Sequence, residues 1–205
     1  MFDALVFDLD GTLWNASENS ALGWNNGLRS LGIDRVITVE ELQKVLGKPG
    51  PECVQILLPA ESKQYPNLLD VLKHYEKIAI QTNGGKLYDS LETTIKSLSR
   101  KYDLFLVSNC GEWYLNEFFK VSGIKEYLRG YDCYGISKQN KSEMLIKLKQ
   151  KYHLTRPAYI GDTETDEKAA RNAGYAFIFA GYGFGVSHNP DLRINSLSEL
   201  MDIGQ

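Results

Sequence analysis

The sequence predicts an α/β protein, built as a doubly wound parallel sheet with a small helical cap inserted after the first strand. Two observations support this prediction. From residue 88 onward, short apolar runs alternate with amphipathic helical segments, which is typical of a parallel sheet covered by helices on both faces. Residues 14–85 are instead almost entirely helical in pattern, and they follow directly on the first apolar run. We therefore expect a core of residues 1–13 and 86–205 and a cap of residues 14–85.

The first strand is predicted over residues 2–8 and delivers two acids to the edge of the sheet. Its apolar run, Ala4-Leu5-Val6-Phe7, fits one buried parallel strand, and Asp8 and Asp10 follow before Gly11 turns the chain away. Ligands bind beyond the carboxyl ends of parallel strands, so acids placed here are suited to chemistry. Two carboxylates this close repel each other unless a cation or a shared proton intervenes. The pair predicts a metal site, although acids before a glycine also occur in ordinary turns.

The predicted cap consists of helices joined by short loops. Apolar residues at helical spacing and a capping box at Thr38-Val39-Glu40-Glu41 define the first two helices. The expected segments are helices over residues 16–31, 38–46, 51–58 and 66–77, a short return segment at 78–80 and a hinge at 81–85. The aromatic residues Trp14, Trp24 and Tyr65 either line a cleft or fill the interior of the cap, and we expect most of them to be interior.

Lys48 is the cation of a tight loop, Gly47-Lys48-Pro49-Gly50-Pro51, in which two prolines and two glycines restrict the backbone. Two interpretations stay open for it. One is a lysine fixed to meet a carboxylate or phosphate of a substrate, and the other is an ordinary solvated loop lysine.

The rest of the core is predicted as alternating helices and strands. Strands are expected at 104–107, 131–134, 157–160 and 175–179, helices at 89–102, 113–121, 142–152 and 166–172, and the start of a closing helix at 196–200. Three of the strands end in a polar residue at the carboxyl end, namely Asp8, Ser108 and Asp162. In a parallel sheet these ends share one edge, so the three side chains are candidates for a single site.

Four segments in this order resemble the four sequence motifs of the haloacid dehalogenase superfamily, in its phosphatase form. They are Asp8-Leu9-Asp10-Gly11-Thr12, Leu104-Phe105-Leu106-Val107-Ser108-Asn109, Lys141 and Gly161-Asp162-Thr163-Glu164-Thr165-Asp166. The resemblance covers most of the chain. In its size and in the position of its cap, the chain is similar to the phosphoglycolate phosphatase branch of this superfamily. It implies a cap that closes over a small substrate and excludes water.

The resemblance also implies roles for the first motif. Asp8 matches the nucleophile, which attacks phosphorus and forms an aspartyl-phosphate. Asp10 matches the general acid and base, which protonates the leaving oxygen and later takes a proton from the hydrolytic water. Thr12 would pin Asp10 by a hydrogen bond from its hydroxyl.

A Mg²⁺ site is implied by the same motifs. The Asp8 carboxylate, the backbone carbonyl of Asp10 and Asp162 would bind the ion, which suits a hard cation that keeps several waters. Asp166 would act through a bound water or by orienting its neighbours, and Asp162 is the preferred direct ligand of the two.

A phosphate site completes the implied constellation. Ser108 would offer its hydroxyl, Asn109 a further donor, and the start of the following helix its backbone N–H groups, although Ser108 and Asn109 also suit a plain helix cap. Lys141 would hold the phosphate and Asp8 as a point charge. Lys138 is the rival for this role, and we prefer Lys141 because it directly precedes an apolar-periodic helix.

Composition limits the partners. A net charge of −3 and the lack of a basic stripe indicate no nucleic-acid partner, and no apolar run suggests a membrane helix. The amino terminus has no features of a signal peptide, and Cys53, Cys110 and Cys133 are too scattered for a zinc or redox pair, so we expect a cytoplasmic protein. Cys110 is interpreted as a packing residue. The oligomeric state stays open.

The predicted function is a Mg²⁺-dependent phosphatase acting on a small phosphomonoester. A dehalogenase would need neither the metal nor the second acid, and a receiver domain would carry no cap of about seventy residues, so both are disfavoured. A sugar phosphomutase shares the whole constellation and remains an alternative, as does a non-catalytic phosphate-binding or regulatory module. The substrate stays open among phosphoglycolate, a sugar phosphate, a nucleotide and pyrophosphate.

Overall fold

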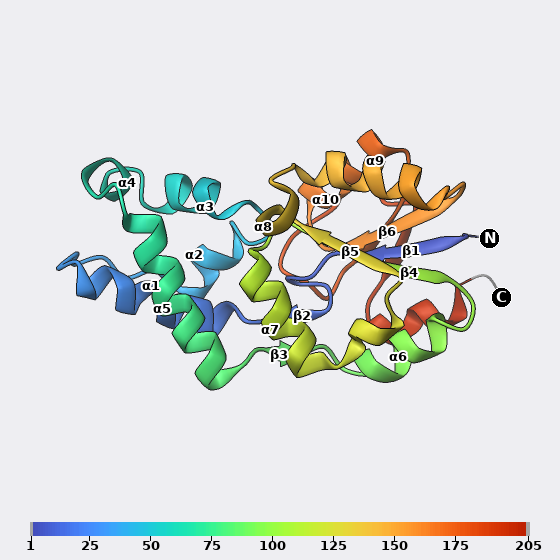
Figure 1. Cartoon of the computed structure of the whole chain (residues 1–205), viewed down its shortest axis with the longest axis horizontal. Helices are drawn as coiled ribbons and strands as arrows, with labels where there is room; N and C mark the ends of the chain where they lie inside the picture. Colours follow the sequence, from blue (N-terminus) through green and yellow to red (C-terminus); the bar gives the residue numbers. More distant parts are fainter. Residues whose placement is uncertain (1, 204–205) are drawn as a thin grey trace.

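The computed structural model describes residues 2–203 and contains a six-stranded parallel sheet in the order β5-β4-β1-β6-β7-β8 (Figure 1). Strand β1 (Ala4–Phe7) is central and pairs with β4 (Asp103–Ser108) on one side and β6 (Pro157–Gly161) on the other. The outer strands are β5 (Gly130–Cys133), β7 (Ala176–Ala180) and β8 (Leu192–Ile194). Because β1, β4 and β6 are neighbours, the residues that follow them meet at one edge of the sheet.

Helices cover both faces of the sheet, so the predicted doubly wound α/β class is confirmed. Helices α9 (Lys141–Tyr152) and α10 (Glu164–Ala173) lie on one face, and α6 (Leu91–Leu98), α7 (Glu112–Ser122) and the 3₁₀ helix η2 (Leu197–Asp202) on the other. Successive side chains of β1 alternate between these layers, Leu5 and Phe7 toward α7 and Ala4 and Val6 toward α9. The shorter elements η1 (Ile124–Tyr127) and α8 (Tyr134–Ser137) flank β5.

Residues 16–85 form a helical insert between β2 (Trp14–Asn15) and β3 (Lys86–Leu87), which pair as a two-stranded antiparallel ribbon. Its helices are α1 (Ser17–Ser30), α2 (Val39–Gln43), α3 (Gly50–Leu57), α4 (Glu61–Gln64) and α5 (Leu68–Asn83), gathered at one end of the molecule in Figure 1. The insert has its own apolar cluster, in which Trp24, Leu28 and Leu72 are buried. It is therefore packed around a centre separate from the two layers of the sheet.

Two glycines of α1 bring that helix close to α5. A Cβ atom at Gly23 would lie 2.4 Å from Cα of Glu76, and one at Gly27 would lie 3.1 Å from a methyl carbon of Leu72. A larger residue at Gly23 would collide with backbone rather than with a movable side chain. The crossing of α1 and α5 thus fixes the position of Glu76 in the insert.

The structure corrects the end of the insert. The predicted return segment at 78–80 and hinge at 81–85 do not form, because α5 continues without a break to Asn83. The run Ile78-Ala79-Ile80 resembles a short strand, but Ala79 and Ile80 are buried at helical spacing from Leu72. Burial of that helical face outweighs the β-preference of the isoleucines.

The five predicted strands are present as β1, β4, β5, β6 and β7, whereas β8 was not expected. Leu192 and Arg193 in β8 are exposed, and only Ile194 is buried, so the segment lacks the apolar run that marks the other strands. The ribbon β2–β3 was also missed, since each of its strands has only two residues.

Candidate active site

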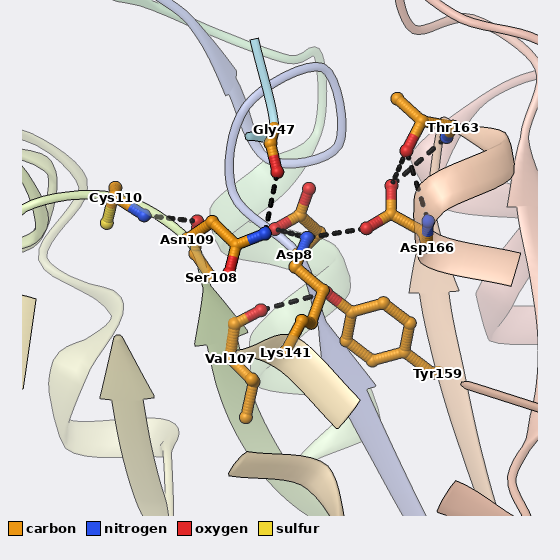
Figure 2. Close-up of polar contacts among 10 residues, drawn as sticks. All are labelled: Asp8, Gly47, Val107, Ser108, Asn109, Cys110, Lys141, Tyr159, Thr163 and Asp166. Carbon is orange, nitrogen blue, oxygen red and sulfur yellow. Dashed lines mark hydrogen bonds and ion pairs between the residues drawn. The ribbon is translucent and has the colours of Figure 1, made fainter. Parts of the chain in front are cut away.

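A buried lysine lies between two buried aspartates at the carboxyl edge of the sheet (Figure 2). Nζ of Lys141 is 2.9 Å from Oδ1 of Asp8, which follows β1, and 2.5 Å from Oδ1 of Asp166 in α10. The side chain of Lys141 is 3% exposed, and both aspartates are fully buried. Lys141 is the first residue of α9, which Asn140 and Glu143 start with a capping box. Local capping therefore sets the point at which this lysine enters the site.

The pKa values of these groups follow from burial and from each other. Burial raises the pKa of Asp8 to about 6, with Lys141 opposing that shift and Asp166 adding to it. Burial alone would lower the pKa of Lys141, but Asp166 and Asp8 more than offset it and raise that pKa above its usual value. Lys141 therefore carries a permanent positive charge between the two acids.

Three carboxylates, those of Asp8, Asp162 and Asp166, place oxygens within 4.8 Å of one another. Lys141 can neutralise one negative charge, so two remain when all three acids are ionised. Oδ2 of Asp8 and Oδ1 of Asp162 are buried and have no hydrogen-bond partner among the described residues. Free carboxylate oxygens beside uncompensated negative charge fit a hard divalent cation such as Mg²⁺.

Asp166 differs from Asp162 because both of its oxygens are already engaged. Oδ1 contacts Lys141, and Oδ2 accepts hydrogen bonds from the backbone N–H and the hydroxyl of Thr163 at 3.1 and 2.6 Å. Thr163 in turn caps α10 through the N–H of Asp166. This arrangement fits a residue that orients Lys141 better than one that binds a metal directly.

Asp162 lies against the glycine-rich loop of residues 181–185, which belongs to none of the four motifs. Its Oδ2 accepts a hydrogen bond of 2.7 Å from the backbone N–H of Phe184. A Cβ atom at Gly11 would lie 2.1 Å from that oxygen, and one at Gly183 would lie 2.3 Å from Cβ of Asp162. Gly11 also has a φ of +76°, which favours glycine. Close backbone approach from two loops thus fixes this carboxylate.

Asp10 is buried, and its partner is a tyrosine. The hydroxyl of Tyr114, in α7, donates to Oδ1 of Asp10 at 2.5 Å. Burial raises the pKa of Asp10 to about 7, against the opposing effect of this hydrogen bond. An acid with a pKa near neutrality suits transfer of a proton in either direction. The predicted hydrogen bond from Thr12 is wrong, because its buried hydroxyl has no partner within residues 2–203 and Oδ1 of Asp10 accepts from Tyr114.

Ser108 is the last residue of β4 and Asn109 follows it, beside Asp8 (Figure 2). The hydroxyl of Ser108 accepts a hydrogen bond of 3.3 Å from the N–H of Cys110, and helix α7 begins only after Gly111. The side-chain amide of Asn109 donates to the backbone carbonyl of Gly47 at 2.8 Å, while its own Oδ1 is buried and unpartnered. Gly47 belongs to the helical insert, so Asn109 connects the sheet edge to the insert.

The other two candidate lysines lie apart from the acid cluster. Lys48 forms an ion pair with Glu52 at 2.8 Å, and Lys138 is exposed and donates to the carbonyl of Gly135. Both line a cavity beside the site, but the structure brings only Lys141 of the three into contact with Asp8. This geometry favours Lys141 over Lys138.

A cavity of about 380 Å³ lies between the helical insert and the sheet edge. Asp10 and Asn109 line it from the sheet edge, and Lys48 and Glu76 line it from the insert. A cavity of this size, beside a cluster of buried acids, is the usual form of a small-molecule binding site.

Comparison with known proteins identifies the family. The sequence profile described as haloacid dehalogenase-like hydrolase matches residues 5–180. The chain belongs to this family. A phosphoglycolate phosphatase from Vibrio vulnificus (strain CMCP6) is 26% identical over 216 residues, which cover 97% of this chain and 94% of that protein. A pyrophosphatase from Listeria innocua is 26% identical over 211 residues, covering 97% of this chain and 94% of that protein.

Solved structures of haloacid dehalogenase-like hydrolases share the fold. A predicted phosphoglycolate phosphatase from Haemophilus somnus has a TM-score of 0.86 at 22% identity, covering 100% of this chain and 98% of that one. A haloacid dehalogenase-like hydrolase from Streptococcus pneumoniae has a TM-score of 0.88 at 21% identity, covering 100% of this chain and 99% of that one. The resemblance stated from the motifs is confirmed, and so is the predicted class, an enzyme of the phosphatase type.

Several residues of this hydrolase site carry no motif signal. Tyr114 comes from the first turn of α7, and Tyr159 from the middle of β6, where its hydroxyl donates to the carbonyl of Val107 at 2.8 Å. The Nζ of Lys141 lies 5.6 Å from the centroid of the Tyr159 ring. The sequence pattern predicts that aromatic residues among apolar neighbours lie in the hydrophobic core. The position of these two tyrosines beside the charged groups is therefore visible only in the structure.

Two remaining expectations concern cysteines and membranes. Cys53, Cys110 and Cys133 are all free, and Cys110 packs against the core beside the cavity, as predicted for a packing residue. Within residues 2–203, no helix combines the length and the apolar composition that crossing a bilayer would require.

Proposed function

We propose that this hydrolase is a Mg²⁺-dependent phosphatase that hydrolyses a small phosphomonoester through an aspartyl-phosphate on Asp8. The observation that carries the proposal is the state of the Asp8 carboxylate. One oxygen is held by Lys141, and the other is buried at the carboxyl edge of the sheet with no partner among residues 2–203. A carboxylate held at one oxygen and free at the other is oriented for attack on phosphorus.

Asp10 would act as the general acid and base. It lies two residues after Asp8, and its raised pKa of about 7 allows it to hold a proton for the leaving oxygen. After the alcohol leaves, the same carboxylate would accept a proton from the water that hydrolyses the aspartyl-phosphate. Tyr114 would fix its direction through the hydrogen bond to Oδ1.

Mg²⁺ would be held by the Asp8 carboxylate, by Oδ1 of Asp162 and by the backbone carbonyl of Asp10, where it would offset the negative charge of the acids and the phosphate. Lys141 would balance the negative charge of the transferred group from the opposite side. Ser108 and the free capacity of Asn109 would donate to phosphate oxygens.

The helical insert would act as the cap. It closes one side of the cavity, and its contact with Asn109 brings it onto the sheet edge. Relatives named phosphoglycolate phosphatase and pyrophosphatase support a small phosphate-bearing substrate. We place the enzyme in the cytoplasm, because three free cysteines suit a reducing compartment.

The test is hydrolysis of a generic aryl phosphate by the purified protein, with Mg²⁺ and then with a chelator. We expect phosphate release that needs the metal and is abolished in Asp8→Asn, because an amide cannot form the acyl phosphate. Release of inorganic phosphate, rather than its transfer to another hydroxyl, separates hydrolysis from the mutase alternative. Full activity of Asp8→Asn would remove Asp8 from the nucleophile role.

A further inference from the structure

The cavity beside Asp10 has an aromatic wall. Trp24 of the insert, and Trp113, Tyr114 and Tyr134 of the core, all line it. Because Asp10 would protonate the leaving oxygen of the ester, the leaving group must extend into this space. The residues around the cavity therefore determine which leaving groups are accepted.

Glu76 brings a carboxylate into this cavity from helix α5. Its backbone is fixed by the close crossing of α1, where a Cβ at Gly23 would lie 2.4 Å from Cα of Glu76. Glu76 is half-buried, and within residues 2–203 it forms no ion pair. A carboxylate that is held in place beside a substrate cavity, without a cation of its own, is accessible to a positively charged group of a ligand.

The groups beside Glu76 compensate its charge only in part. Ser20 Oγ and Trp24 Nε1 are buried and have no other hydrogen-bond partner within residues 2–203, and both lie close enough to Glu76 to lower its pKa. Burial acts more strongly than these two groups and Lys73 together, so the net pKa of Glu76 is raised. The interior of the cavity thus contains an acid that lacks a cation.

The lysines of the cavity belong to its rim. Lys73 and Lys138 are exposed, and Lys48 is already paired with Glu52. The acid Glu112 is also exposed. Charges in contact with water are screened, whereas a charge deep in the cavity acts on a ligand with little screening. The field felt by a bound leaving group is therefore set mainly by Glu76 and Asp10.

We propose that Glu76 is a specificity-determining residue, which selects phosphomonoesters whose leaving group carries an ammonium and disfavours those that carry a carboxylate. An ammonium would pair with the Glu76 carboxylate and lie against the aromatic faces of the wall, two interactions that together recognise organic cations. A carboxylate in the same place would meet a like charge, which is an effective means of rejection. The inference rests on the proposed phosphatase activity, and it separates this chain from relatives named phosphoglycolate phosphatase, since phosphoglycolate carries a carboxylate.

The experiment compares three esters of similar size: 2-aminoethyl phosphate, n-propyl phosphate and phosphoglycolate. For the wild-type enzyme we expect kcat/KM to fall in that order. In Glu76→Gln we expect kcat/KM for 2-aminoethyl phosphate to drop by about 10- to 100-fold, the range for a lost hydrogen bond to a charged group, with n-propyl phosphate almost unaffected. The value for phosphoglycolate should rise, because the repelling charge is gone.

The matched control is Asp70→Asn, which removes one negative charge from the exposed side of the same helix. In this variant the kcat/KM values of the three esters should keep their wild-type ratios. A change in these ratios equal to that in Glu76→Gln would overturn the proposal, because it would assign the effect to overall charge. A wild-type preference for phosphoglycolate, or an equal loss with all three esters in Glu76→Gln, would also overturn it.

Binding measurements keep the inference separate from the proposed function. Calorimetry on Asp8→Asn, which should not turn the esters over, gives their affinities directly, and adding Glu76→Gln should remove the preference for the amine. If no ester is hydrolysed by the wild type but this binding order is found, the phosphatase proposal fails and the selectivity stands. If aryl phosphate is hydrolysed but the binding order is absent, the selectivity fails alone.

Discussion

The sheet edge and the helical insert hold their charged side chains in opposite ways. At the sheet edge, Lys141 is buried and bonded to two buried aspartates, so each group fixes the others. In the insert, Lys48 is paired only with the half-exposed Glu52, and Glu76 has no partner among the described residues. A buried network tolerates few changes, because each removal leaves an uncompensated charge. In the proposed function, the residues that carry the chemistry lie in this buried network, and the residues that select the substrate lie in the insert.

After Asp8→Asn, which should abolish turnover, Asp10→Asn should have the largest effect on rate, because it removes proton transfer at the sheet edge. We expect kcat to fall by about 10²- to 10⁴-fold, the usual contribution of a general acid or base. Steady-state kinetics with an aryl phosphate and with a poor, alkyl leaving group would check this. The loss should be larger for the alkyl ester, which needs the proton more, and equal losses would assign Asp10 another role.

Lys141→Met should destabilise the fold strongly, because it leaves Asp8 and Asp166 buried without their cation. We expect a loss of roughly 3–5 kcal/mol in the free energy of unfolding, measured by urea denaturation. Burial already raises the folded-state pKa of Asp8 to about 6, above its unfolded value, so its protonated form favours folding. Without Lys141 this pKa should lie higher still, because the lysine opposes its rise. The deficit should therefore narrow as the pH falls toward about 6 and level off below it, where Asp8 is protonated in both proteins. A deficit independent of pH would mean that packing, not charge, causes it.

The same glycine-to-alanine change should act differently in the two regions. Gly183→Ala places a Cβ 2.3 Å from Cβ of Asp162, so the loop must move, and we expect about 1–3 kcal/mol of destabilisation for such overpacking. In Gly50→Ala the nearest atoms are side-chain carbons at 3.6 Å and beyond, and α3 begins there. Thermal unfolding should find Gly50→Ala neutral or slightly stabilised. Equal losses would contradict the close packing of Gly183 against Asp162.

Lys48→Ala should have the smallest effect. The ion pair with Glu52 is partly exposed, and such pairs contribute about 0.2–1 kcal/mol, so stability should change little. If Lys48 contacts substrate, KM for the best substrate should rise several-fold while a generic aryl ester is unaffected. Unchanged KM for both would return Lys48 to the solvated-loop interpretation.

The fold was predictable where apolar patterns are long and regular. The buried runs Ala4-Leu5-Val6-Phe7 and Leu104-Phe105-Leu106-Val107 are strands of the expected kind. Prediction failed for Ile78-Ala79-Ile80, where packing of α5 on α1 overrides local preference, and for β8, whose exposed residues carry no apolar signal. Local patterns do not contain the tertiary contacts that decide such segments.

The candidate site was predictable where its residues end a strand or directly follow one. Asp8, Ser108 and Asp162 are brought to one edge by the order of the strands, which alternation along the chain already implies. Tyr114 and Glu76 were missed, because each is one polar group on an otherwise ordinary helix. Their role depends on the packing of the insert against the sheet, which one sequence cannot specify.

The hydrogen bond between Asn109 and Gly47 connects the insert to a residue of the proposed phosphate site. The amide of Asn109 has two N–H donors, of which one is directed at Gly47. If the other donates to a phosphate oxygen, as we propose, one side chain would contact both the phosphate and the insert. Release of the inorganic product and movement of the insert away from the sheet edge would then be coupled through that side chain.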